Sequence, residues 1–395
     1  MISVKAKGIS PSPTLAIDSK FKEMKANGED VVGFGAGEPD FDTPKHICDA
    51  AVEAIHAGKT RYTPAAGTMQ LRKAIVEKFK KENQLDYTPA NIVVSNGAKH
   101  SLVNTFMAIC NPGDEVLIPA PYWVSYPEMV KIADGVPVIL HTEEENGFKA
   151  TAQEIEAAIT EKTRAIILNS PSNPTGMVYS AEELKAIADV AVKHHIYVVS
   201  DEIYEHLIYE GKHVSIASFN DEIKDLTIVV NGVSKTYAMT GWRIGFTASN
   251  AEIAKAMGSI QSHATSNPNS IAQEAALAAL EGDKTCVQDM KREFVKRRDY
   301  MVDEINSIEG VSCTKPNGAF YIMMNISGLI GKEYYGTKIQ NADDFAEAFL
   351  NVAGVAVVPG TGFGVPNYVR WSYATSMDNV KEGLSRLKKF LNGEY

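Results

Sequence analysis

The sequence predicts an α/β protein whose larger part is built on a mostly parallel sheet. Seven short apolar runs follow one another between residues 91 and 249, and helical patterns separate several of them. Most positions within these runs are apolar, which is typical of strands covered on both faces. After residue 290 the pattern changes to a long charged helix and short mixed segments. Buried strands interleaved with helices indicate a parallel sheet, and the later change indicates a second, smaller α+β lobe.

The elements can be placed along the chain from these patterns. The first 30 residues combine a Ser/Pro segment with one short helical pattern. A helix is expected over residues 180–195, because Ser180 and Glu183 have the spacing of a capping box. The strands expected in the large sheet are residues 91–95, 115–121, 137–142, 164–171, 196–202, 226–232 and 244–249. Beyond them we expect a helix over residues 289–308, strands within 318–326, 354–360 and 369–374, and a final helix.

Length and composition limit the class of protein. A chain of 395 residues is too long for one compact core, so we predict a large domain over residues 46–290 and a small domain made of residues 1–45 and 291–395. The net charge of −10 argues against nonspecific binding of nucleic acid or anionic membranes. The sequence lacks an apolar run of membrane-spanning length and an apolar signal segment. Four scattered cysteines without a CxxC pair suggest reduced thiols and a cytoplasmic protein.

Polar residues follow several of the expected strands. Ligands of open α/β sheets bind beyond the carboxyl ends of the strands, so residues at these ends are candidates for a shared site. The candidates are Asn169 and Asn173, Asp201 and Tyr204, Lys235, the turn of Gly97, Ala98 and Lys99, and Tyr122 with Trp123.

This set of side chains matches the needs of one cofactor. A lysine can form a Schiff base with an aldehyde, and a buried aspartate can hold a protonated ring nitrogen. An indole can stack on an aromatic ring. A glycine turn that opens a helix presents backbone N–H groups to a phosphate. Together these properties describe a site for pyridoxal 5'-phosphate (PLP).

Longer motifs make the prediction more specific. "SNPTG" (172–176), "SDEIYEHLIYEG" (200–211) and "SKTYAMTGWRIG" (234–245) occur in this order, with "GEPDFDTP", "YTPAAG", "PYWVSYPEMV" and "VRWSYATS" elsewhere. Across essentially the whole chain, the sequence resembles the class I aspartate aminotransferase family of fold type I PLP-dependent enzymes. The resemblance implies a large domain with a mostly parallel seven-stranded sheet, a smaller α+β domain, and a homodimer with shared active sites.

The resemblance assigns roles around the cofactor ring. It implies that Lys235 carries the cofactor as an aldimine and then moves the α-proton of the substrate. Asp201 would pair with the pyridine N–H group. Asn173 and Tyr204 would bond the phenolic oxygen, and Trp123 would stack on the ring.

It also assigns the phosphate site. The turn at Gly97 with the backbone N–H groups of Ala98 and Lys99 would hold the phosphate together with Arg243, and Ser234 is expected to add its hydroxyl. Many relatives have a serine three residues before the lysine, where this chain has Gly232. The resemblance implies that Tyr62 reaches the phosphate in the neighbouring subunit.

The substrate site is implied in the same way. Arg370 would bind the substrate α-carboxylate, helped by the Gly37 backbone and Asn173. Lys99, Ser12 and Thr14 match a bacterial subgroup that uses a lysine and hydroxyls for the distal carboxylate. Trp123 and Phe320 would form aromatic walls. These matches favour ping-pong transamination between aspartate and 2-oxoglutarate.

Other functions stay open at this stage. A prephenate or broader aromatic and dicarboxylic aminotransferase is one, and a PLP-dependent β-lyase of the same fold is another. A PLP-binding regulatory module is disfavoured, since about 30 residues precede "GFGAGEPD" and the chain is acidic.

Several site residues also have simpler explanations. Lys99, Ser12 and Thr14 could be ordinary residues at helix starts. Asp201 and Glu202 could cap a helix, and we expect no more than this of Glu202. His206 and His213 suggest a metal, but we expect no coherent carboxylate set beside them.

Overall fold

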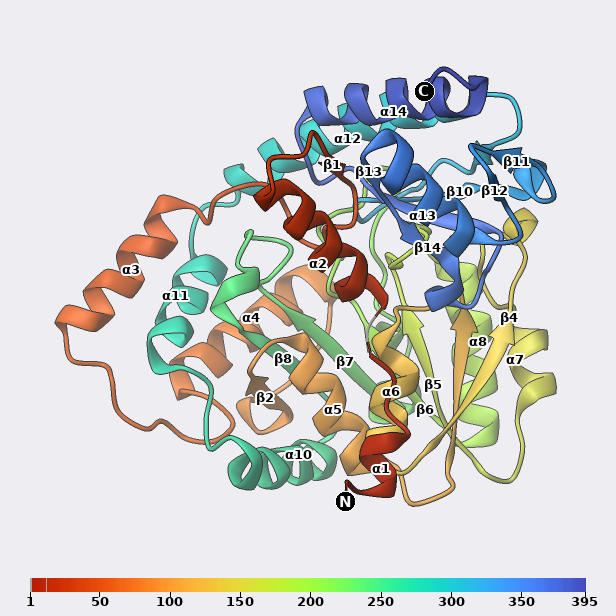
Figure 1. The fold of residues 1–395 in the computed structure, drawn as a ribbon. Coiled ribbons are helices and arrows are strands. Elements are labelled where there is room, and N and C mark those ends of the chain that lie inside the picture. The colour runs from red at the N-terminus through yellow and green to blue at the C-terminus, as the bar shows by residue number, and fades with distance from the viewer. Residues whose placement is uncertain (1, 12) are drawn as a thin grey trace.

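A seven-stranded sheet forms the centre of the molecule (Figure 1). The computed structural model describes residues 2–11 and 13–395. The strand order is β2 (Ile92–Ser95), β8 (Gly245–Ala248), β7 (Thr227–Gly232), β6 (Tyr197–Asp201), β5 (Thr163–Asn169), β3 (Glu115–Ala120) and β4 (Val136–His141). Strands β7, β6, β5, β3 and β4 pair in parallel, whereas β8 runs antiparallel to both of its neighbours. The seven apolar runs are therefore the seven strands, and the mostly parallel α/β fold is confirmed.

Helices cover both faces of this sheet (Figure 1). Successive strand residues point to opposite faces: Ile118 packs in one core cluster with Phe106, and Leu117 packs in another with Leu184. The first cluster includes α5 (Ala98–Ile109), α6 (Ser125–Ile132) and α10 (Ala251–Ala264). The second includes α7 (Ala152–Ala158), α8 (Ala181–His194) and α9 (Asp221–Leu226). A third joins α3 (Lys45–His56), α4 (Met69–Asn83) and α11 (Ser270–Glu281) to β2 and β8.

The capping box expected at the start of α8 is present. The Ser180 side chain accepts a hydrogen bond from the Glu183 N–H group, and the Glu183 carboxylate accepts one from the Ser180 N–H group. This start fixes the helix that follows the β5 loop.

A second, antiparallel sheet lies above the first in Figure 1. Its order is β14 (Val358–Pro359), β15 (Tyr368–Ser372), β10 (Tyr321–Asn325) and β9 (Ser312–Cys313). Phe294, Phe349 and Phe390 pack in its core from α12 (Thr285–Asn306), α13 (Ala342–Ala353) and α14 (Met377–Asn392). A short hairpin of β11 (Glu333–Tyr334) and β12 (Thr337–Lys338) completes this part.

The N-terminal segment joins the second sheet. Strand β1 (Val32–Gly33) pairs in parallel with β13 (Val355–Ala356), and α2 (Pro13–Ala26) packs on β13 and β14. Helix α1 (Val4–Lys7) lies lower, where Lys5 pairs with Asp134 at 2.8 Å. Within residues 2–11 and 13–395, each helix is too short or too polar to span a bilayer.

Glu144 links the two sheets at one end of their contact. Its carboxylate accepts hydrogen bonds from Thr314 at 3.0 Å, from Asn325 at 3.0 Å and from Tyr368 at 2.9 Å. Contacts of this kind hold the second sheet over the carboxyl ends of β5, β6 and β7.

Candidate active site

A cavity of about 680 Å³ lies at the carboxyl ends of β5, β6 and β7, beneath the second sheet. Because these three strands are parallel neighbours, the residues that follow them meet at one edge. The cavity brings together Gly37, Ala98, Lys99, Trp123, Asn173, Asp201, Tyr204, Ser234, Lys235, Arg243 and Arg370 from the residues predicted above. It is also lined by Lys22, Glu38, Tyr126, Asn169, Thr240 and Tyr321.

Lys235 projects into this cavity from the turn after β7. Its Nζ donates a hydrogen bond to the carbonyl oxygen of Gly37. Burial lowers the pKa of Lys235 to about 8; Glu38 opposes this shift, whereas Arg243 and Arg370 add to it. Near neutral pH a larger fraction of this amine is therefore unprotonated than of an ordinary lysine, which favours a role as nucleophile or base.

Asp201 is the last residue of β6 and is buried in the cavity wall. The Tyr126 hydroxyl donates to Oδ2 at 2.7 Å, and the Ile203 N–H group donates to Oδ1 at 3.2 Å. Burial raises the pKa of Asp201 to about 6, although both hydrogen bonds act in the opposite direction. A buried carboxylate of this kind gains from a cationic N–H partner in the cavity.

The sequence analysis did not identify Tyr126. It lies three residues after Trp123, and the two rings make an edge-to-face contact with centroids 5.4 Å apart. One signal in the sequence could have identified Tyr126: it lies three residues after the predicted stacking residue Trp123, at the start of a helix.

Two tyrosines form the upper wall. The hydroxyls of Tyr204 and Tyr321 are 2.9 Å apart, and the Arg370 guanidinium lies 4.5 Å from the Tyr321 ring centroid. The expected wall residue Phe320 lies instead in the core, edge-to-face against the Tyr204 ring at 5.5 Å. Adjacent residues at a strand point to opposite sides, so Tyr321 faces the cavity and Phe320 does not.

Arg370 is buried on β15 and oriented by two acceptors. Its Nη1 donates to the Asn173 side-chain oxygen at 3.0 Å, and its Nη2 donates to the Gly35 carbonyl at 2.9 Å. Among the described residues its buried Nε has no hydrogen-bond partner. A guanidinium held in this way still offers N–H groups to a carboxylate in the cavity.

The start of α5 forms an open cradle. Gly97 caps the helix with φ of 87°, and a Cβ there would lie 2.3 Å from Nη2 of Arg243. Gly245 packs so closely that a Cβ on it would lie 2.2 Å from the Ala98 nitrogen. The helix N–H groups and the guanidinium therefore converge on a place that suits a phosphate.

Lys99 lies beside this cradle. Its Nζ is 4.8 Å from the Trp123 ring centroid. Partial burial and the charge of Arg243 lower the pKa of Lys99.

Besides Phe320, other predicted residues are not among those that line the cavity. Tyr62 follows α3 and is 89% exposed. Thr14 lies in α2, and its side chain lies outside what the structure describes. Ser12 lies outside the described residues.

The chemistry of these donors fits PLP. The α5 cradle with Arg243 would hold the phosphate, Asp201 the pyridine nitrogen, Trp123 the ring face and Lys235 the aldehyde carbon. The orphaned Nε of Arg370 leaves a place for the carboxylate of an amino acid.

The family pattern described as aminotransferase class I and II matches residues 29–387. The chain belongs to this family. It is a PLP-dependent aminotransferase, and enzymes of this family act on small amino acids and oxo acids.

Relatives cover the whole aminotransferase chain. An aspartate aminotransferase of Bacillus sp. (strain YM-2) is 50% identical, and the alignment covers 99% of both chains. An aspartate/prephenate aminotransferase of Nitrosomonas europaea is 48% identical, with 99% of this chain and 100% of that one covered. The structure of an aspartate aminotransferase from Thermus thermophilus with maleate superposes with a TM-score of 0.94 at 44% identity, covering 99% of both chains.

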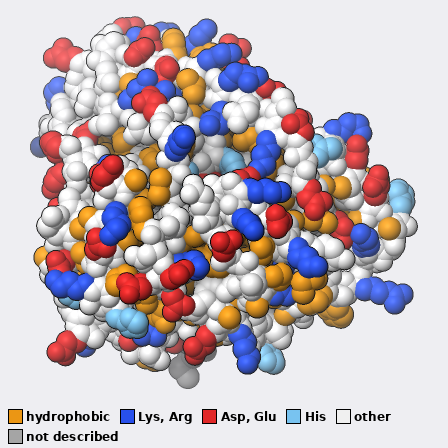
Figure 2. Space-filling view, turned by 180° about the vertical axis from the view of Figure 1, so that it is seen from behind, with side chains coloured by type: hydrophobic (Ala, Val, Ile, Leu, Met, Phe, Trp, Pro, Cys, Tyr) orange, Lys and Arg blue, Asp and Glu red, His pale blue; other side chains and the backbone are white. Residues whose placement is uncertain are grey.

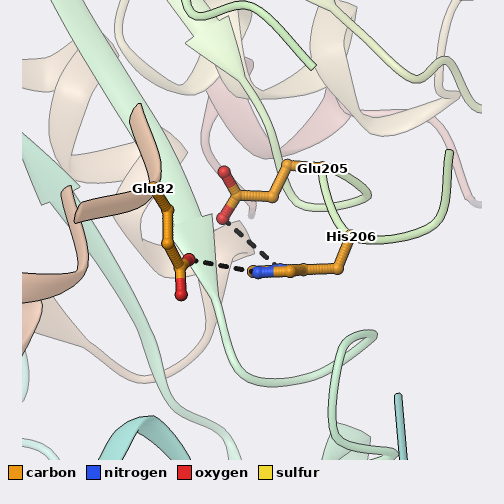
Figure 3. A group of neighbouring side chains, drawn as sticks. All are labelled: Glu82, Glu205 and His206. Carbon is orange, nitrogen blue, oxygen red and sulfur yellow. Dashed lines mark hydrogen bonds and ion pairs between the residues drawn. The ribbon is translucent and has the colours of Figure 1, made fainter. Parts of the chain in front are cut away.

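A partly buried charged cluster lies behind the cavity wall. We call it the rear cluster; it consists of Lys78, Glu82, Asn83, Glu202, Glu205, His206, His213 and Lys284. Figure 3 shows the His206 ring between the carboxylates of Glu82 and Glu205. The expectation that His206 and His213 lack a carboxylate set is therefore wrong.

The rear cluster contains its own cations. Ligand atoms of Glu82, Glu205 and His206 lie within 4.8 Å of one another, which is close enough for a metal ion. However, Lys78 contacts the Glu205 carboxylate and Lys284 contacts that of Glu82. The two ammonium groups already supply the positive charge that a metal would bring.

Glu202 belongs to this cluster and is not a helix cap. Turns rather than a helix follow β6. The buried Glu202 carboxylate accepts hydrogen bonds from Ser200 at 2.9 Å and Ser215 at 2.6 Å, and it contacts His213 at 2.8 Å. The local pattern suggested a cap, but tertiary contacts with residues further along the chain determine its role.

Proposed function

We propose that this aminotransferase exchanges amino groups between aspartate and 2-oxoglutarate in a ping-pong reaction. The observation that carries the proposal is the charge of the cavity wall, which has the basic residues Lys22, Lys99, Lys235, Arg243 and Arg370 against the acidic Glu38 and Asp201. Arg243 suits the phosphate of the cofactor, and Arg370 suits the α-carboxylate of the substrate. The ammonium group of Lys99 then favours a substrate with a second carboxylate.

The named relatives support a dicarboxylic substrate. The Bacillus enzyme is called an aspartate aminotransferase, and the Thermus structure contains maleate, a dicarboxylate. The Nitrosomonas relative is called an aspartate/prephenate aminotransferase, and prephenate also carries two carboxylates, so it is our second candidate substrate.

We propose the following division of work among the side chains. When bound, PLP withdraws electrons from the substrate α-carbon. Asp201 keeps a proton on the pyridine nitrogen, and Tyr126 keeps the Asp201 carboxylate in place. Arg370 orients the substrate through its α-carboxylate, while Asn173 fixes the Arg370 guanidinium.

Lys235 is the proposed proton carrier. Its lowered pKa allows Nζ to accept the α-proton and to return it to a neighbouring atom. The Tyr204 ring centroid lies 6.0 Å from Nζ, and we propose that the Tyr204 hydroxyl bonds the phenolic oxygen of the cofactor. Trp123 and the second sheet limit the access of water to the reacting atoms.

We further propose two domains and a dimer. Separate core clusters support a large PLP-binding domain at residues 46–290 and a small domain at 1–45 and 291–395. The exposed Tyr62, with Val52, Ile55 and Met69 nearby in sequence, supports a homodimer in which Tyr62 serves the partner's phosphate site. A cytoplasmic location is supported by free thiols at Cys48, Cys110, Cys286 and Cys313.

The test is the absorbance of the purified holoenzyme. L-Aspartate alone should convert bound PLP to pyridoxamine phosphate in proportion to the number of sites, and 2-oxoglutarate should restore it. Lys235→Ala should abolish the conversion. Unchanged absorbance with aspartate but conversion with L-phenylalanine would replace aspartate by an aromatic donor. Release of pyruvate and ammonia from an amino acid that carries a leaving group on its β-carbon, without stored amine, would indicate a β-lyase instead.

A further inference from the structure

Residues that face the cavity alternate in sequence with residues that face the rear cluster. At three places a cavity residue is followed directly by a residue whose side chain is bonded in the cluster. The pairs are Asp201 with Glu202, Tyr204 with Glu205, and Lys235 with Thr236, which contacts His206. In each pair, one peptide bond therefore joins a residue that faces the cavity to a residue that faces the rear cluster.

Glu205 is the centre of the rear cluster. It forms an ion pair with Lys78 and accepts a hydrogen bond from Asn83 at 2.8 Å, both from α4. The oxygen that contacts Lys78, Oε1, also accepts a hydrogen bond from Asn231 of β7 at 2.8 Å. One carboxylate thus joins α4, the segment after β6, and the strand that leads to Lys235.

His206 extends the cluster to the lysine turn. Its Nδ1 lies 3.2 Å from Thr236 Oγ1, and its Nε2 lies 3.1 Å from Glu82 (Figure 3). His213 closes the other side through its contact with Glu202 at 2.8 Å.

Opposite charges meet in the rear cluster. Three carboxylates, of Glu82, Glu202 and Glu205, face the two ammonium groups of Lys78 and Lys284 and the imidazole of His213. Burial lowers the pKa of His213, but Glu202 and Glu205 outweigh this effect and raise it. Burial would raise the pKa of Glu205, but Lys78, His206 and His213 outweigh it and hold the pKa well below its usual range.

Paired charges with buried members resist rearrangement. Removing one charge leaves its partner buried and uncompensated, so neighbouring segments must move or admit water. Because Tyr204 and Glu205 share a peptide unit, a shift of the Glu205 side chain is transmitted to the Tyr204 hydroxyl within the cavity.

We propose that the rear cluster positions Asp201, Tyr204 and Lys235 for reaction, and that Glu205 is its central positioning residue. Glu205 does not line the cavity, and its influence passes through the backbone of its neighbours. The proposal depends on aminotransferase chemistry but not on aspartate being the substrate, so it can fail or hold independently of the substrate assignment.

The main test is Glu205→Gln in the PLP-loaded enzyme. This nearly isosteric change keeps an oxygen acceptor but leaves Lys78 with only the more distant carboxylate of Glu82, at 3.8 Å. We expect kcat to fall about tenfold or more with little change in KM, because catalytic geometry rather than substrate binding is disturbed. We also expect the pH at which bound PLP changes its absorbance to move by about half a unit or more, since Asp201, Tyr204 and Lys235 set it.

Two further variants separate positioning from simple stability. Arg386→Gln removes a largely buried guanidinium that pairs with the exposed Asp30 and Glu382, outside the cavity lining. It should lower Tm while leaving kcat and the absorbance titration unchanged. His206→Ala removes the contact to Thr236 from a partly exposed position, so folding should persist if Glu205→Gln does not fold. His206→Ala should move the midpoint of the absorbance titration in the same direction as Glu205→Gln does, by a smaller amount.

The outcomes are distinct. A moved titration midpoint and a lowered kcat in Glu205→Gln or His206→Ala, with neither effect in Arg386→Gln, support the proposal. If the cluster variants lower only Tm and keep both the titration midpoint and kcat, the rear cluster is merely structural and the proposal is overturned. If the wild-type enzyme is active but prefers another amino donor, only the substrate assignment fails.

Discussion

At the scale of single residues, Asp201 shows how function opposes stability. Its folded pKa of about 6 lies above the ordinary aspartate value of 3.8, because burial disfavours the charged form. Between about pH 4 and 6, Asp201 is therefore protonated in the folded apoprotein and ionised in the unfolded chain. Raising the pH through this window favours unfolding by roughly 2–3 kcal/mol in the absence of PLP.

Asp201→Asn should accordingly stabilise the apoprotein. The gain should be small near pH 4, grow up to about pH 6 and stay constant above it, on the order of 2–3 kcal/mol. With PLP present, the wild-type protein should instead be more stable than the variant, because the neutral amide of the variant offers no charge to the pyridine nitrogen. Thermal unfolding with and without PLP at several pH values measures both effects.

An exposed aspartate gives the control for this prediction. Asp49 forms only a surface ion pair with Lys45, so Asp49→Asn should change Tm little at any pH. If Asp201→Asn lowers the Tm of the apoprotein at pH 8, burial does not dominate the pKa of Asp201.

The sequence was sufficient to predict those site residues whose position depends only on the strand that they end or follow. Asp201 and Lys235 come directly after apolar runs, so their placement needed only the direction of the strands. Tyr126, Glu38 and Tyr321 face the same cavity from other elements, and tertiary packing decides which side chain turns inward. The choice between Phe320 and Tyr321 illustrates this limit, since both are aromatic and adjacent.

At the scale of elements, the start of α5 depends on Gly97. Its φ of 87° suits glycine, and a Cβ would displace the Arg243 guanidinium, whose Nη2 would lie only 2.3 Å from it. Gly97→Ala should therefore weaken PLP binding about tenfold or more, through backbone strain and loss of the Arg243 position. Titration of the apoprotein with PLP gives the dissociation constant.

Gly113 provides a matched control for the cradle. It has φ of 90°, but a Cβ there would meet nothing within 4 Å. Gly113→Ala should cost a similar backbone strain and leave PLP affinity unchanged. Equal losses of affinity in both variants would mean that strain alone, and not the Arg243 contact, is responsible.

The same scale shows why strand positions were predictable and their directions less so. Apolar runs identified the strands of the large sheet, because burial on both faces leaves a pattern in each run. Nothing within residues 244–249 indicates that β8 runs antiparallel to β7 and β2, because its direction depends on how the chain returns after the turn at Lys235. The rear cluster could likewise not be predicted from the sequence, since its members come from α4, the segment after β6, and the start of α12.

At the scale of the whole molecule, opposite charges are mixed over the face seen in Figure 2, whereas positive charge gathers in the cavity. The face opposite to that of Figure 1 carries Lys and Arg side chains interspersed with Asp and Glu (Figure 2). The cavity wall, in contrast, carries five basic residues and two acidic ones. An anionic substrate is therefore drawn to the cavity and not to this outer face.

The segment around Tyr62 points to a second copy of the chain. Helix α3 stands out from the rest of the molecule at the left of Figure 1. Val52 and Ile55 on it are each 51% exposed, and Tyr62 is 89% exposed. One chain leaves these side chains in water, whereas a twofold partner would cover them.

A mixed dimer tests whether Tyr62 acts across the interface. One subunit carries Lys235→Ala and the other Tyr62→Ala, each with a different affinity tag, and the mixed species is purified by both tags. If Tyr62 serves the partner, the mixed dimer contains one intact site, formed by Lys235 of one subunit and Tyr62 of the other. That site should bind PLP with wild-type affinity and retain wild-type turnover, whereas the Tyr62→Ala homodimer should bind PLP more weakly in both sites. A mixed dimer whose active site has the reduced affinity of that homodimer would mean that Tyr62 acts within its own subunit, and a monomer in sedimentation would contradict the shared site altogether.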